Sequence, residues 1–236
     1  MSKLYDEIVK DVLADAADTD DSEIEDDEYV DVVSVSDKAI EFYDRRDGFD
    51  YHYILTNPDL INKDWVMERL IFTRSCEEKL PIDRGELASW IAKIPASMLM
   101  TVSRIVFIYD DEADWDELFE DERIGNLLEE QNFPDDGQLG ITWATANICI
   151  VHVRNIVEGT QKLFETGQLY AWEKAGCINE GILTTIAHEI RHIAQNNPYL
   201  PENVLGQSPD DSDEDDAEAF AQNFLEEHSA YCLLDV

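Results

Sequence analysis

Two histidines lie four positions apart in the stretch "TTIAHEIRHIAQNNPYL", at His188 and His192, and Glu189 follows the first directly. An α-helix has 3.6 residues per turn, so side chains four positions apart lie one above the other on the same face. Both imidazoles can then reach one metal ion at about 2.0–2.1 Å, the usual zinc–nitrogen distance. Glu189 lies beside them, where a carboxylate can act as a base toward water. The spacing therefore predicts a helical zinc site with hydrolytic chemistry.

The segment around the two histidines has the pattern of an amphipathic helix. We expect the helix to begin after Asn179, a residue type that caps helices, and to end near Gln195, before Pro198. Within it, four isoleucines fall in a sector of about 80° and form an apolar face. These are Ile182, Ile186, Ile190 and Ile193. His188 and His192 lie about 40° apart and point away from the centre of this face.

A zinc ion that activates water needs three protein ligands, so that one position stays open. The segment "EDDAEAFAQNF" (214–224) is predicted to be a helix that supplies the third ligand. Its apolar face consists of Ala217, Phe220, Ala221, Phe224 and the following Leu225. Glu214 lies within this face, whereas Asp215 points the opposite way and Asp216 lies at its margin. A carboxylate on a core face costs free energy unless a cation neutralises it, which favours Glu214 as the ligand and leaves Glu218 as the alternative.

Together the two segments resemble the zincin metallopeptidases. A third histidine six residues after the second would indicate the metzincin group, but that position is Pro198 in this chain. Glu214, Ala217 and Glu218 match in order the Glu-x-x-Ala-Asp/Glu pattern of the gluzincin group. The resemblance covers about residues 179–228.

This resemblance implies a zinc-dependent peptidase. His188, His192 and Glu214 would hold Zn²⁺, and Glu189 would activate the water that attacks a peptide carbonyl. Glu218 would orient a histidine ligand, if it is not itself the ligand. Candidates for a donor that stabilises the transition state are Tyr199, Tyr231, His152, His228 and an arginine.

The resemblance also implies a zincin-like α+β fold. Its parts would be a mixed sheet with an edge strand that pairs with an extended peptide, then the histidine helix, then a C-terminal helix that carries Glu214. Residues 140–153 are expected to provide the edge strand.

The charge of the chain limits its partners. Its 17 Lys and Arg stand against 54 Asp and Glu, which gives a formal net charge of −37. Such a surface repels nucleic-acid phosphates and anionic lipids, so it disfavours direct nucleic-acid or membrane binding and favours basic peptide or protein substrates. The same charge supports an alternative to an enzyme. In that alternative the chain is an acidic interaction protein that mimics DNA or inhibits a basic partner, with or without an inactive zincin scaffold.

Further features indicate a cytoplasmic protein. No apolar segment follows Lys3, so no signal peptide is expected, and the apolar run at 96–109 is interrupted by Arg104 and is too short to span a bilayer. The cysteines form no Cys-x-x-Cys pair and are interpreted as reduced structural thiols. They are Cys76, Cys149, Cys177 and Cys232.

The pattern along the chain predicts an α+β domain at 32–236, preceded by an acidic helix and a flexible arm at 1–31. The arm contains ten acidic residues within 14–31 and no Lys or Arg, which disfavours a packed structure. Predicted strands lie at 30–36, 103–110 and 140–153 (the last as one strand or a pair), with a hairpin at 39–55 that turns at Asp47-Gly48. Predicted helices lie at 4–13, 62–76, 83–94, 114–131 and 155–167. His52 and His152 are interpreted as structural residues of strands.

Overall fold

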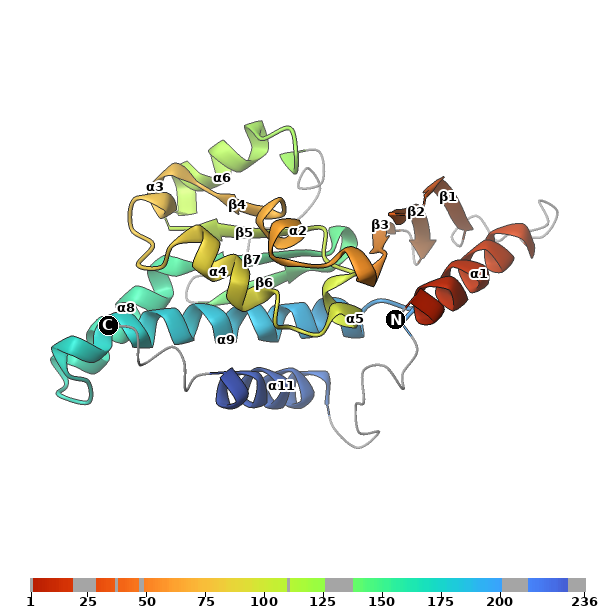
Figure 1. Ribbon diagram of the computed structural model, residues 1–236. Helices are drawn as coiled ribbons and strands as arrows, with labels where there is room; N and C mark the ends of the chain where they lie inside the picture. The colour runs from red at the N-terminus through yellow and green to blue at the C-terminus, as the bar shows by residue number, and fades with distance from the viewer. Residues whose placement is uncertain are drawn as a thin grey trace.

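The computed structural model describes residues 2–18, 29–36, 38–46, 49–109, 111–125, 138–200 and 212–228. These residues form an α+β fold, in which helices cover a four-stranded sheet and a three-stranded antiparallel sheet lies toward the N-terminal helix (Figure 1). The predicted fold class is therefore confirmed at the level of α+β.

Four strands form the central sheet: β4 (Leu70–Phe72), β5 (Arg104–Ile108), β6 (Gly140–Trp143) and β7 (Ile148–His152). In the order β4-β5-β7-β6, the first three are parallel and β6 runs antiparallel to β7. The continuous apolar sequences of β4, β5 and β7 suit parallel strands that are buried on both faces. Among the described strands, β6 has a neighbour on one side only, so it forms an edge of the sheet.

Alternate residues of β5 and β7 contribute to two apolar clusters, one on each face of the sheet. One cluster also contains the isoleucines of α9 (Lys174–Gln195), and its strand members are Ile105, Phe107, Cys149 and Val151. The other packs against Trp115 and Leu118 of α6 (Asp111–Glu120), and its strand members are Val106, Ile108, Ile148 and Ile150. The remaining helical elements are η1 (Pro58–Leu60), α2 (Lys63–Met67), α3 (Arg74–Glu77), α4 (Arg84–Ile91), α5 (Ala96–Leu99), η2 (Ala144–Ala146), α8 (Val153–Glu165) and η3 (Ala171–Glu173).

The long helix α9 lies across the central sheet and contacts β6 and β7. Its predicted apolar face is confirmed, because Ile182, Ile186, Ile190 and Ile193 are all 0% exposed. The predicted N-cap was wrong, since α9 begins at Lys174 and Asn179 lies inside it. The local reason is the preceding turn η3, where the backbone N–H of Tyr170 donates to the Glu173 carboxylate at 2.8 Å. This hydrogen bond stabilises a turn directly before Lys174, so the helix starts there and not at Asn179.

The C-terminal helix α11 (Asp213–His228) packs along α9, on the side away from the central sheet (Figure 1). Its buried residues are Ala217, Ala221 and Phe224, which belong to the predicted apolar face. The small side chains of the two alanines let the two helix backbones approach closely. The helix that was expected to supply the third ligand is therefore present and lies next to the histidine helix.

The N-terminal part consists of α1 (Ser2–Asp18) and a three-stranded antiparallel sheet of β1 (Tyr29–Val35), β2 (Ala39–Arg46) and β3 (Phe49–Thr56). The predicted hairpin is confirmed by the pairing of Arg46 with Phe49, while its turn at Asp47-Gly48 lies outside the described residues. Tyr5 and Ile8 of α1 belong to the same apolar cluster as the core of the domain.

Two boundaries of the N-terminal prediction differ in the structure. Of the expected arm at 14–31, residues 14–18 are helical and 29–31 are in β1, while 19–28 lie outside the described residues.

One helix prediction was wrong in kind. The segment 62–76 contains α2, then strand β4, then α3. Leu70, Ile71 and Phe72 pair with β5 in parallel register, and the free energy of this burial overrides the local helical pattern. The helix predicted at 114–131 ends at Glu120 as α6, and 126–137 lie outside the described residues. The segment 140–153 is a pair of strands, separated by η2 and by Asn147 in the left-handed conformation (φ 53°).

The described cysteines Cys76, Cys149 and Cys177 are free thiols, and Cys232 lies outside the described residues. Burial raises the pKa of Cys76 to about 12 and, together with Glu189, raises that of Cys149 well above its usual value. Among the described helices, none is both long and apolar enough to cross a bilayer.

The contact between α8 and α9 depends on a glycine, which provides a test of the packing. A Cβ on Gly181 would lie 2.7 Å from Ile156 Cγ2, so we expect Gly181→Ala to lower the free energy of unfolding by about 1–3 kcal/mol through overpacking. Gly159→Ala in α8 is the control, because its Cβ would meet nothing within 4 Å. Without such a contact, alanine should raise helix stability by about 0.5–1 kcal/mol. Urea unfolding measures both variants, and equal effects would contradict the packing described.

Candidate metal centre

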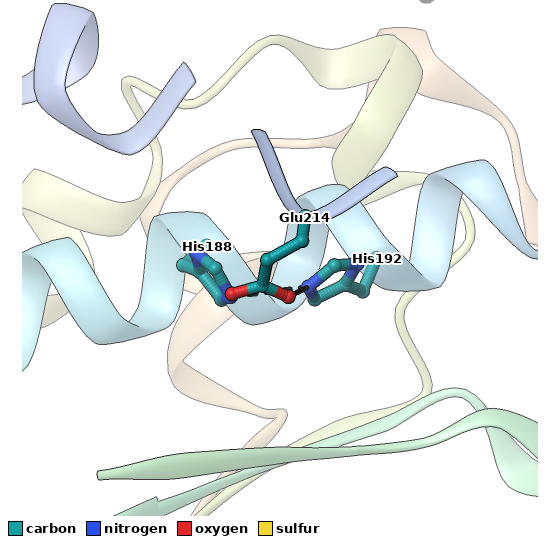
Figure 2. Close-up of side chains that lie close together, drawn as sticks. All are labelled: His188, His192 and Glu214. Carbon is teal, nitrogen blue, oxygen red and sulfur yellow. Dashed lines mark hydrogen bonds and ion pairs between the residues drawn. The ribbon is translucent and has the colours of Figure 1, made fainter. Parts of the chain in front are cut away.

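The helix α9 places His188 and His192 one turn apart (Figure 2). By helical periodicity they lie on the side away from its isoleucine face. Their ring centroids are 4.6 Å apart with the planes at 83°, and the two Nε2 atoms lie 3.0 Å apart. The side chains are 22% and 17% exposed, so they are accessible from the surface but held by their surroundings.

The Glu214 carboxylate from α11 completes the group (Figure 2). Its Oε1 lies 3.4 Å from His188 Nε2, and its Oε2 lies 3.2 Å from His192 Nε2. One ligand atom from each of the three residues lies within 4.8 Å of the others. Two ligands that are each about 2.0–2.1 Å from a tetrahedral zinc are separated by about 3.3 Å, so these spacings fit a shared ion. The structure thus brings together the three residues that were predicted as ligands.

The Gln195 side chain sets the tautomer of His192. Gln195 Nε2 faces two acceptors, the backbone O of Asp213 at 2.9 Å and Asp216 Oδ2 at 2.7 Å. Its Oε1 therefore faces His192 Nδ1, at 2.8 Å, and accepts a hydrogen bond from the N–H of that nitrogen. With the proton on Nδ1, the lone pair of His192 lies on Nε2, which points at His188 and Glu214. This is the form of imidazole that binds a metal.

The charge state of His188 is also consistent with a ligand. Burial lowers the pKa of His188, and His192 lowers it further, while Glu214 and Glu218 raise it in part. A depressed pKa favours the neutral imidazole, which is the form that coordinates zinc.

Glu189 lies beside the group and is held by the edge strand. It is 8% exposed, and this burial raises its pKa, although the hydrogen bond from Thr142 opposes the shift. Thr142 Oγ1 lies 2.8 Å from Glu189 Oε2 and 2.9 Å from the Glu189 backbone O. The carboxylate of Glu189 is not a member of the three-residue ligand group.

Strand β6 approaches α9 at Gly140. A Cβ at this position would lie 2.4 Å from Thr185 Cγ2, 2.8 Å from Glu189 Cγ and 2.9 Å from Glu189 Oε1. Only a residue without a side chain allows the strand to lie this close to the helix. Gly140 and Thr142 were not singled out from the sequence, because their contacts are with a distant segment: Thr142 and Glu189, for example, are 47 positions apart.

A cleft of about 500 Å³ opens between β6 and α9, and the ligand group forms part of its wall. It is lined by Gln138, Leu139, Gly140, Ile141, Thr142, Thr184, Thr185, His188, Glu189, His192 and Glu214. The cleft therefore brings the ligand group, the buried carboxylate of Glu189 and the edge strand to one surface.

The argument that selected Glu214 was wrong in its physical basis. The Glu214 side chain is 71% exposed, so burial does not penalise its charge. The carboxylate on the buried side of α11 is Asp216, which is 13% exposed and pairs with Arg191, itself 3% exposed. Arg191 neutralises this buried carboxylate, and the sequence analysis did not single it out, although it lies between Glu189 and His192 in the motif.

The structure does not bring Glu218 into the ligand group. Glu218 is exposed, and its Oε1 accepts a hydrogen bond from Gln222 at 3.0 Å. The partner that orients His192 is Gln195, one turn further along α9, and not an acid on α11.

None of the described candidates for a transition-state donor lines the cleft. His152 is buried, the Tyr199 hydroxyl donates to Asp44 at 3.4 Å, and His228 packs against Phe224. Tyr231 lies outside the described residues.

Comparisons with known proteins leave the functional argument to the residues themselves. No protein-family profile matches this chain, and neither a curated protein nor a solved structure matches it.

The hydrogen bond to Glu189 can be tested by a matched pair of substitutions at Thr142. Thr142→Val keeps the shape but leaves the buried carboxylate without this donor, so we expect the free energy of unfolding to fall by about 1–3 kcal/mol. Thr142→Ser retains the hydroxyl and should be closer to the wild type. Urea unfolding at neutral pH measures both, and equal losses would show that the hydroxyl does not hold Glu189.

Proposed function

We propose that this chain is a zinc-dependent metallopeptidase of the zincin type. The observation that carries the proposal is the convergence of His188, His192 and Glu214 from two helices, beside buried Glu189, in the wall of an open cleft. Two imidazoles and one carboxylate are the donor set of hydrolytic zinc sites, in which three protein ligands leave one position open. The mixed sheet with its antiparallel edge strand β6 agrees with the expected zincin-like arrangement.

The residues around the cleft suit peptide hydrolysis. When bound, zinc would lower the pKa of water and polarise a carbonyl group. Glu189 would accept a proton from water as the water oxygen attacks the peptide carbonyl carbon. The same carboxyl group then donates this proton to the amine that leaves as the C–N bond breaks. Burial raises the pKa of Glu189, which makes the carboxylate a stronger base toward water and helps it hold the proton until the amine leaves.

The edge strand offers a means to bind an extended substrate. Residues 138–142 line the cleft, and β6 pairs with β7 on one side only among the described strands. The outer backbone groups of such a strand can pair with an extended peptide. This supports a polypeptide substrate over a small molecule, and the net charge of −37 favours a basic one.

The same charge supports a second candidate, an acidic protein that binds a basic partner without chemistry. The two functions differ in their dependence on zinc. Tight binding of a basic protein that survives chelation and Glu189→Gln, together with no hydrolysis by the wild type, would favour the second candidate.

Zinc binding is expected to depend on Glu214 and not on Glu218. Removal of a ligand should weaken zinc by more than the roughly 10–100-fold that loss of an outer hydrogen-bond partner costs. Titration calorimetry of chelator-treated protein with Zn²⁺ should therefore show one site in the wild type and in Glu218→Ala, and a severe loss in Glu214→Ala. The two glutamates are both exposed on α11, so they form a matched pair. Loss of zinc in Glu218→Ala alone would reassign the ligand, and no binding by the wild type would refute the proposal.

Glu189→Gln separates chemistry from metal binding. The amide keeps the shape of the side chain but cannot accept the proton, so hydrolysis should fall by about 100-fold or more. Zinc content should remain, because Glu189 is outside the ligand group. Mass spectrometry of products from an unfolded basic protein measures the activity, and elemental analysis measures zinc. A variant that cleaves as fast as the wild type would exclude Glu189 as the base.

A further inference from the structure

The aspartate two positions after Glu214 is the main polar contact between α11 and α9. Asp216 accepts hydrogen bonds from Arg191 Nε at 2.5 Å and from Arg191 Nη2 at 2.9 Å. Arg191 lies on α9 between Glu189 and His192, and its guanidinium also lies 5.5 Å from the centre of the Phe220 ring on α11. The pair joins the helix that carries two candidate ligands to the helix that carries the third.

This ion pair is directional, whereas the apolar contacts between the two helices are not. The buried residues of α11 are Ala217, Ala221 and Phe224, and the small side chains of the two alanines do little to prevent the helix from sliding or rotating. A two-pronged contact between a guanidinium and a carboxylate is satisfied in one relative position only. Both side chains are almost fully buried, so a shift of α11 would leave an uncompensated charge in the interior.

Asp216 also makes a contact with Gln195, which in turn contacts His192. Its Oδ2 accepts a hydrogen bond from Gln195 Nε2 at 2.7 Å, and Gln195 Oε1 accepts a hydrogen bond from His192 Nδ1 at 2.8 Å. The carboxylate thus fixes which end of the Gln195 amide faces the histidine. If the Gln195 amide were inverted, its N–H would face the Nδ1–H of His192, and its carbonyl oxygen would face the Asp216 carboxylate.

We propose that Asp216 is a positioning residue that preforms the ligand group without touching the ion. Through Arg191 it fixes the position of α11 and therefore of Glu214, and through Gln195 it fixes the ring and tautomer of His192. The effect on the metal rests on the proposed zinc function, whereas the effect on α11 does not.

The test compares Asp216→Asn with Asp121→Asn. Asp121 also binds a guanidinium with two oxygens, but its partner Arg123 is exposed and lies outside the metal group, so it is a matched control. Hydrogen exchange of the α11 amides in chelator should become at least about 10-fold faster in Asp216→Asn and stay unchanged in Asp121→Asn. Unchanged exchange in Asp216→Asn would overturn the role of Asp216 in docking α11.

Cobalt provides a spectroscopic measurement of the ligand group itself. Titration with Co²⁺, followed by its visible absorption, should show affinity about 10–100-fold weaker in Asp216→Asn, with a changed band shape. Gln195→Leu should weaken Co²⁺ in the same way but accelerate exchange of α11 less, because the ion pair with Arg191 remains. A wild-type spectrum and affinity in both variants would overturn the positioning of His192.

A double variant guards against simple unfolding. Arg191→Met with Asp216→Leu replaces the buried ion pair with apolar side chains, a change that is often neutral for stability. It should restore slow exchange in α11 while Co²⁺ affinity stays below the wild type, since Gln195 has lost its carboxylate acceptor. Full recovery of Co²⁺ affinity would show that Asp216 acts only by docking α11, and it would overturn the proposed positioning of His192 through Gln195. Wild-type protein that binds neither Co²⁺ nor Zn²⁺ would refute the zinc function, and the exchange experiment would still decide the docking of α11.

Discussion

The packing of the α9 isoleucine face against the central sheet is the constraint on which the site depends. Four fully buried isoleucines fix the rotation of the helix about its axis, because any turn of the helix would expose apolar surface to water. That rotation places His188 and His192 on the opposite side and Glu189 at the border, next to β6. The chemistry of the site is therefore oriented by the hydrophobic effect acting on residues that take no part in it.

The distribution of charge separates the interior from the surface. The chain has a formal net charge of −37, yet the ionised side chains near the site are few and have specific partners. Arg191 and Asp216 neutralise each other, and Glu189 accepts a hydrogen bond from the Thr142 hydroxyl. Buried charges are costly unless they are paired or hydrogen-bonded, and these contacts meet that requirement beside the cleft. The exposed Glu214 has a different position, in the wall of the cleft, where its carboxylate lies 3.4 Å from His188 Nε2 and 3.2 Å from His192 Nε2.

The accuracy of the sequence predictions followed the range of the interactions involved. The helix of the two histidines, its apolar face and the β2–β3 hairpin depend on periodicity and turn chemistry within a few residues, and all three were confirmed. Strand β4 was predicted as helix because its structure depends on pairing with β5, more than thirty positions away. The predicted N-cap at Asn179 was wrong for a local reason, since the hydrogen bond between Tyr170 and Glu173 stabilises a turn before Lys174 and the helix starts there. Glu214 was selected correctly as a neighbour of the histidines, but the buried carboxylate was Asp216.

The sequence by itself determined the spacing of His188, Glu189 and His192, the amphipathic helix that carries them, and the large negative charge. Each of these follows from residue order or composition, so no contact between distant segments is needed to establish it. Only the tertiary structure decided that Glu214 meets the two histidines, that Thr142 and Gly140 adjoin Glu189, and that Arg191 and Asp216 join the two helices. These contacts depend on how α9 packs against both β6 and α11. That packing is set by the burial of side chains from the whole domain, which a local pattern does not encode.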